Sequence, residues 1–191
     1  MFSQTAIFLI TTLGDLFALA LLLRFMLQLL RAPARNQLTE FVAAVTDFVV
    51  RPARRVMPGW WGLDLATLAL AWLVEAAQNW LTLQLRGYEL GSAVGIALIA
   101  LAALAAVQIA RLAIYVVMVA VVVQAVLSWV NPYSLLAPLL ASVTRPFLRP
   151  FQKLVPTIAN VDLSPLIVLI LCQLLVTVPL AWLEALFRRL L

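Results

Sequence analysis

The chain has 191 residues, of which 65% are hydrophobic and only 11% are charged. A soluble domain carries about a quarter charged residues, and one of this length could not bury so much apolar surface, so the surrounding solvent must be lipid. The net charge of +5 comes from twelve arginines and Lys153, which flank the apolar segments, so a nucleic-acid partner is not expected.

Four long apolar segments predict an all-α integral membrane protein. They cover about residues 6–30, 63–83, 90–130 and 163–187. The third would measure about 60 Å as a single helix, which is twice the hydrocarbon thickness. It forms either one overlong helix or two spans that break near Gln108–Arg111. No glycine or proline marks a turn there, and a break would put the flanking basic loops on opposite sides of the membrane, so we favour four spans.

Two polar loops, residues 31–62 and 131–162, separate these spans. In the first loop, apolar residues recur with helical spacing between Leu38 and Val49, which predicts an amphipathic helix in the headgroup layer. A similar stripe in the second loop is interrupted by Pro138. We expect the basic residues of both loops to bind anionic lipid headgroups or acidic segments of other membrane proteins: Arg51, Arg54, Arg55, Arg145, Arg149 and Lys153.

The two loops are copies of one pattern, which divides the chain into residues 1–86 and 87–191. A shift of 98 residues superposes the motif residues of the first loop on those of the second, and upstream a shift of 100 places Arg24 on Gln124. Each copy is predicted to be a helix–amphipathic basic loop–helix unit. Both loops then lie on one side, as in a parallel repeat, and the positive-inside rule places them in the cytoplasm. The superposed residues are Thr46 on Thr144, Pro52 on Pro150, Pro58 on Pro156 and Asp64 on Asp162.

At these residues the chain resembles the YggT (YlmG-related) family of bacterial and plastid membrane proteins. The second copy carries the pattern in Thr144-Arg145-Pro146-Phe147-Leu148-Arg149-Pro150 and in Asp162-Leu163-Ser164-Pro165. The first copy departs from it with Asp47-Phe48 after Thr46 and with Ala66-Thr67 after Asp64, and the second has Gln152 in place of an arginine. The resemblance implies a multi-pass protein of the bacterial plasma membrane. It also implies a non-catalytic role linked to osmotic tolerance, potassium balance, cell division or the assembly of membrane complexes.

The aspartates and prolines of the motif have two possible roles. Asp64 and Asp162 precede spans and are expected to cap helix N-termini, with Pro165 in a first turn, although either carboxylate could instead bind a cation or a partner. If the loops bind an acidic protein, we expect their prolines to hold the arginines in fixed turns rather than in a continuous helix. These prolines are Pro52, Pro58, Pro146, Pro150 and Pro156.

Four charged residues, Asp15, Arg24, Glu75 and Arg111, lie inside apolar spans, where an unpaired charge costs at least a few kcal/mol. The rise per residue places Arg24 and Glu75 at similar depths in the membrane, which predicts an ion pair between them. Asp15 and Arg111 would both lie toward the far side, which suggests a second pair. In the second copy, Gln124 and Gln173 would form a neutral hydrogen bond at the place of the first pair. The alternative is an ion or proton pathway.

We therefore expect a non-catalytic organising or assembly factor of the membrane, with a channel or transporter component as the alternative. The sequence has no histidine and one cysteine, Cys172, so no catalytic, haem, disulfide or metal site is expected, and no cofactor. Other membrane proteins and anionic lipid are the expected partners. Oligomerisation is possible.

Overall fold

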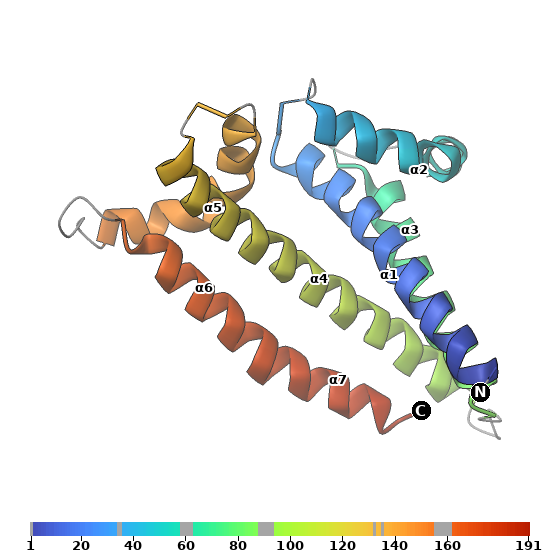
Figure 1. The fold of residues 1–191 in the computed structure, drawn as a ribbon. Helices are drawn as coiled ribbons and strands as arrows, with labels where there is room; N and C mark the ends of the chain where they lie inside the picture. The colour runs from blue at the N-terminus through green and yellow to red at the C-terminus, as the bar shows by residue number, and fades with distance from the viewer. Residues whose placement is uncertain are drawn as a thin grey trace.

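A computed structural model describes residues 2–33, 36–57, 63–87, 94–131, 133–134, 136–154 and 162–191. Within these ranges the regular structure is entirely helical (Figure 1). Helices suit a lipid environment because they satisfy their own backbone hydrogen bonds. In chain order they are α1 (Phe2–Leu29), α2 (Gln37–Val56), α3 (Leu65–Leu85), α4 (Val94–Val130), α5 (Ala137–Leu154), α6 (Ser164–Leu175), a π-helical turn η1 (Val176–Leu180) and α7 (Ala181–Arg188).

Three of the described helices are long and apolar enough to cross a membrane: Ser3–Leu29, Val94–Val130 and the combined helix Ser164–Arg188. The second of these is a single helix of 37 residues, without a break at Gln108–Arg111. The third contains η1 around Pro179, where a wider turn accommodates a residue that cannot donate a backbone hydrogen bond. α3 is more polar and packs beside α1 (Figure 1).

α2 and α5 have corresponding places in the bundle. Both lie across the same end of the bundle, and the two chain termini lie at the opposite end (Figure 1). α2 packs against α1 and α3, and α5 packs in the same way against α4 and α6. In each half of the chain, an amphipathic helix thus contacts the helix before it and the helix after it.

The basic loops are helical at the three motif prolines that the structure describes, so the expectation of fixed turns was wrong at these positions. Pro52 lies inside α2, and Pro146 and Pro150 lie inside α5. All three proline rings are exposed, on the side of the helix that faces away from the bundle. Packing of the opposite face can hold the helix together despite the lost backbone hydrogen bonds. Pro58 and Pro156 lie outside the described residues.

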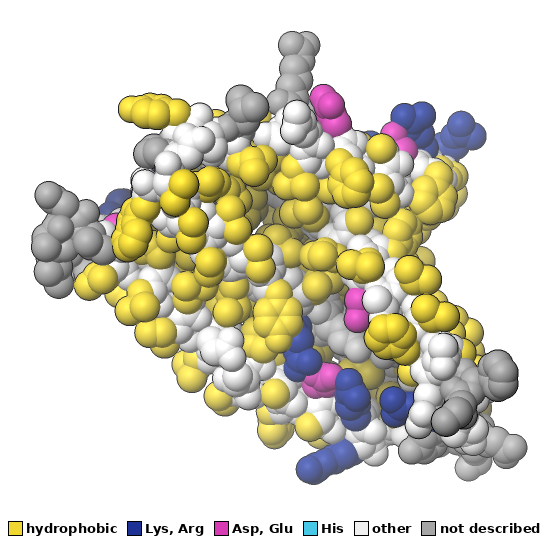
Figure 2. Space-filling view, in the orientation of Figure 1, with side chains coloured by type: hydrophobic (Ala, Val, Ile, Leu, Met, Phe, Trp, Pro, Cys, Tyr) yellow, Lys and Arg dark blue, Asp and Glu magenta, His cyan; other side chains and the backbone are white. Residues whose placement is uncertain are grey.

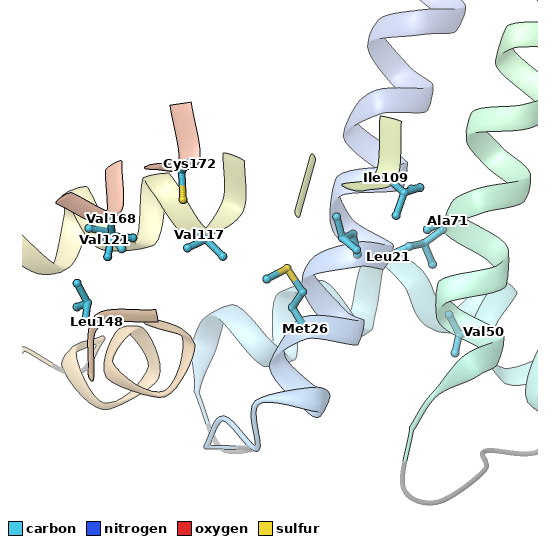
Figure 3. Close-up of a cluster of buried hydrophobic side chains, with 11 residues drawn as sticks. Leu21, Met26, Val50, Ala71, Ile109, Val117, Val121, Leu148, Val168 and Cys172 are labelled. Atoms are coloured by element: carbon cyan, nitrogen blue, oxygen red, sulfur yellow. The ribbon is translucent and has the colours of Figure 1, made fainter. Parts of the chain in front are cut away.

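The buried faces of α2 and α5 join the amphipathic helices to the core (Figure 3). Val50 of α2 is fully buried beside α3, near Ala71, and Leu148 of α5 points toward Val121 and Val168. Val50 and Leu148 are equivalent positions of the two copies, 98 residues apart. One buried aliphatic side chain thus anchors each amphipathic helix at the same point of its unit.

The core position Leu21 gives a test of this packing. Leu21 is 0% exposed, whereas Leu16 on the same helix is 59% exposed. We expect Leu21→Ala to lower the free energy of unfolding by about 2 kcal/mol or more, because it leaves a cavity among packed side chains. The measurement is unfolding of the purified protein in detergent micelles. Leu16→Ala is the matched control and should change stability by much less; equal losses would contradict the packing described.

Candidate functional site

The basic residues predicted to bind partners lie on α2 and α5. Arg51, Arg54 and Arg55 are exposed near the end of α2, and Arg145, Arg149, and Lys153 are exposed on α5. Figure 2 shows basic side chains gathered at the upper edge of a face that is otherwise largely hydrophobic, and a second group of charged side chains lower on the same face. The amphipathic helices therefore present positive charge at one end of an apolar bundle.

Arg24 ties the first span to α2. Its Nη1 donates to Thr46 Oγ1 at 2.7 Å and to Asp47 Oδ1 at 2.8 Å, and Asp47 Oδ2 accepts from Arg51 at 2.6 Å. The predicted pair between Arg24 and Glu75 is wrong, because α2 lies across α1 and brings a nearer carboxylate. The hydrogen bond from Arg24 is the main reason that the pKa of Asp47 lies below its usual value. Since folding lowers this pKa, the contribution to stability is full at neutral pH and is lost as the pH falls through the lowered value.

The second copy makes a neutral version of this contact. Thr144, the equivalent of Thr46, donates its hydroxyl to Gln124 Oε1, and Gln124 stands at the position of Arg24. The hydrogen bond suggested between Gln124 and Gln173 is therefore wrong, and Gln173 is exposed. Where the first copy has Asp47, the second has Arg145. The positive and negative partners of the first copy are thus both changed in the second.

A second contact that both copies share lies where the amphipathic helix meets the following helix. Asp64 is the N-cap of α3 and accepts from the Thr67 backbone N–H at 3.4 Å. Its Oδ2 also accepts from the Thr67 hydroxyl and from Arg54, whose Nη2 lies at 2.5 Å. The carboxylate therefore both begins α3 and holds the end of α2.

In the second copy Asp162 joins α5 to the start of α6 through uncharged partners, from one position before the N-cap residue, Leu163. Its Oδ1 accepts from the Ser164 backbone N–H at 2.8 Å, and its Oδ2 accepts from Gln152 Nε2 at 2.9 Å. Burial opposes ionisation of Asp162, but the hydrogen bonds from Ser164 and Gln152 outweigh it and leave the pKa below its usual value. Pro165 lies in the first turn of α6, where no backbone N–H is needed.

Midway along α1 and α3, two carboxylates share one amide. Gln78 Nε2 donates to Asp15 Oδ1 at 2.8 Å and to Glu75 Oε2 at 2.7 Å. Glu75 and Gln78 are 4% and 6% exposed, and Gln78 Oε1 has no partner among the described residues. No salt bridge is recorded to either carboxylate in the described parts of the chain. This is the polar centre of the first copy.

Arg111 does not pair with Asp15, contrary to our expectation. It pairs with Glu184 of α7, which also accepts from Arg188 at 2.5 Å. The helix that follows η1 presents Glu184 to α4, so Arg111 finds its carboxylate near the end of the chain. Beside this group a cavity of about 370 Å³ is lined by Asp15, Gln78 and Arg188, among others.

Three functional contacts were missed from the sequence: Asp47 to Arg24, Glu184 to Arg111, and Gln78 between the carboxylates. One signal for the first was present, because Arg24 with Asp47 becomes Gln124 with Arg145 in the second copy, a paired change of charge. Among the described residues there is no group of three carboxylate or thiol side chains that could hold a metal ion.

A family model and several related proteins match most of this chain. The sequence model described as CCB3/YggT matches residues 3–85 and 103–183. An uncharacterized protein of Pseudomonas aeruginosa is 37% identical over 175 residues, which cover 91% of this chain and 87% of that protein. The YggT protein of Escherichia coli is 28% identical over 88% of this chain and 85% of its own length. An uncharacterized protein of Haemophilus influenzae is 30% identical over 87% and 86%. No solved structure matches.

The link between Arg24 and Asp47 can be tested by giving the first copy the residues of the second. We expect Asp47→Arg alone to destabilise the protein, because it places two arginines together at a site where the Arg24 side chain is only 14% exposed. Arg24→Gln in the same molecule should restore much of the loss, with a coupling energy of about 1–3 kcal/mol in a double-mutant cycle. Unfolding in micelles measures this, and Glu40→Gln, an exposed change on α2, is the control. Additive losses would contradict the contact.

Proposed function

The chain belongs to the CCB3/YggT family, and we propose that it is a non-catalytic organising or assembly factor of the bacterial plasma membrane. The observation that carries this proposal is the common end at which α2 and α5 lie (Figure 1). Two basic amphipathic helices at one end form a single docking face.

We propose that α3 is a fourth span, which places both termini on the outer side and the docking face in the cytoplasm. With 21 residues α3 is about 30 Å long, which matches the hydrocarbon thickness. Its polar residues Glu75, Gln78 and Asn79 are covered by α1 and α4. A cytoplasmic docking face also agrees with the positive-inside rule.

The docking face suits anionic lipid headgroups and acidic segments of other membrane proteins. Part of the apolar surface of α2 and α5 packs on the bundle, whereas Phe41 and Phe48 of α2 are exposed. The exposed basic residues of the two helices are Arg51, Arg55, Arg145, Arg149 and Lys153. Each basic residue near an anionic leaflet contributes about 1 kcal/mol. The helices can therefore hold a partner without any change in the spans. The two segments matched by the family model fit a repeat of one docking unit.

Neutralising α5 tests this proposal. A photo-crosslinking amino acid at Phe147, which is 38% exposed between the basic residues, should capture lipid or protein partners in native membranes. We expect Arg145→Gln, Arg149→Gln and Lys153→Gln together to reduce the adducts by about 100-fold, since they remove about 3 kcal/mol of attraction.

The matched control neutralises Arg188 and Arg189, which are exposed at the other end of the bundle. This variant should form the same amount of adduct as the unmodified protein.

The sidedness of the docking face has its own test. A single cysteine in place of Arg55 or Arg149, with Cys172→Ser, should be labelled by an impermeant maleimide in inverted vesicles and not in spheroplasts. Unchanged adducts in the neutralised variant would reject the proposal, and so would labelling of the two positions from opposite sides.

A second candidate function, a component of an ion or proton pathway, is favoured by one observation. Glu75 is buried in α3 beside Asp15 without a basic partner in the described residues, next to the cavity of about 370 Å³. Charged residues in that setting are uncommon in spans and often line ion pathways.

The second candidate predicts ion flux in proteoliposomes that depends on Glu75. Glu75→Gln should abolish the flux while preserving the fold, because the amide can still accept from Gln78 and because the second copy has Gln173 at this position. The exposed Glu40→Gln should leave the flux unchanged. Absence of flux above empty liposomes, or equal flux in both variants, would eliminate this candidate.

A further inference from the structure

A second cavity lies at the basic end of the molecule, in the corner between the end of α1 and α2. Its volume is about 330 Å³, which is within the range of small-ligand pockets. Most of its wall is apolar, with Leu27 from α1 and Val42 from α2. Three arginines also line it: Arg24, Arg31 and Arg54.

Positive charge is in excess around this cavity. Arg24 pairs with Asp47 and Arg54 pairs with Asp64, whereas Arg31 is exposed and has no recorded ion pair among the described residues. A guanidinium has five N–H donors, so Arg24 and Arg54 keep donors beyond those that they give to the aspartates. An anion in the corner would meet one unpaired arginine and two others with donors to spare.

Arg31 is held in an unusual backbone conformation. Its φ is 52°, in the left-handed region, and it is the one non-glycine residue with positive φ in the described chain. The Ala32 N–H bonds to the Leu27 carbonyl at 2.8 Å and the Arg31 N–H to the Gln28 carbonyl at 3.1 Å, which is the pattern of a Schellman motif. Glycine usually occupies this position. A bulky residue that is strained there points to a use for its side chain.

The second copy shows that the fold does not need these arginines. The positions equivalent to Arg24, Arg31 and Arg54 are occupied by Gln124, Asn131 and Gln152. Gln124 and Gln152 keep the contacts to Thr144 and Asp162 that Arg24 and Arg54 make to Thr46 and Asp64. Every arginine of the cavity is thus a neutral amide in the copy, although the helices are arranged alike. The positive charge at these three positions is therefore found in the first copy alone.

We propose that this corner binds the phosphate of an anionic phospholipid, with Arg31 and Arg54 on the phosphate and the first methylenes of the acyl chains against Leu27 and Val42. This inference rests on the proposed function, whose docking face it extends with a defined lipid site. Guanidinium groups match the oxygen geometry of phosphate, and they do so most strongly where water is partly excluded. The apolar wall distinguishes a lipid from a free anion. The end of a span beside an amphipathic helix lies at headgroup depth.

The test is lipid binding to the delipidated full-length protein in detergent, followed by native mass spectrometry. The probes are dioleoyl phosphatidylglycerol, dioleoyl phosphatidylcholine and inorganic phosphate. We expect the anionic lipid to bind at least tenfold more tightly than the zwitterionic one, and inorganic phosphate at millimolar concentration not to displace it. Arg31→Asn with Arg54→Gln, the residues of the second copy, should weaken binding of phosphatidylglycerol at least tenfold.

Two controls separate the cavity from general attraction and from folding. Arg188→Gln with Arg189→Gln removes the same charge from exposed positions at the other end of the bundle, which do not line this cavity, and should change the affinity less than threefold. Arg31→Gly fits a φ of 52° without strain, so it should lower the affinity while the thermal midpoint stays the same or rises.

Equal losses in the two double variants would overturn the site, and so would full affinity in Arg31→Gly. Binding of inorganic phosphate with the affinity of the lipid would show an anion site without lipid recognition, which also overturns it. The adducts on α5 depend on Arg145, Arg149 and Lys153, none of which lines this cavity. The lipid site and the docking function can therefore fail independently.

Discussion

One aspartate in each copy determines where the chain turns back into the bundle. Asp64 begins α3 and holds Arg54, ten residues earlier at the end of α2, and Asp162 receives the corresponding hydrogen bond from Gln152. A carboxylate at a helix N-terminus is favourable because it satisfies free backbone N–H groups and faces the positive end of the helix dipole. The bond to the preceding helix fixes the amphipathic helix across the spans. The common basic end of the molecule depends on this arrangement.

The two copies keep the same geometry with different charges. Around Thr46 and Asp64 the first copy uses arginine, and around Thr144 and Asp162 the second copy uses glutamine. A hydrogen bond at the right place is therefore sufficient for the fold, and the residues that form it need not include an arginine. Under the proposed lipid site, the arginines of the first copy would use their remaining donors for binding.

The sequence was sufficient to predict the helices, the amphipathic stripes and the capping of α3 by Asp64, because each depends on residues close together in the chain. Asp162 was also expected to be an N-cap, but it lies one residue before the N-cap of α6, Leu163. The ion pairs were not predictable in this way. Arg24 was matched by depth to Glu75, yet α2 supplies Asp47 from a direction that helix lengths do not reveal. The prediction of turns at the prolines was wrong for a related reason. Packing of Val50 and Leu148 keeps α2 and α5 helical although proline has a low helix propensity.

The wide turn η1 changes which side of the last helix faces the rest of the bundle. A π-helical turn contains one extra residue, which rotates everything after it by about 100° relative to an uninterrupted α-helix. Without that rotation, Glu184 would leave the side of the helix that meets Arg111. The side of the helix that faces the bundle thus shifts by little more than a quarter of a turn at η1. A homologue one residue shorter between Val176 and Leu180 would need a different counter-ion for the arginine of its longest helix.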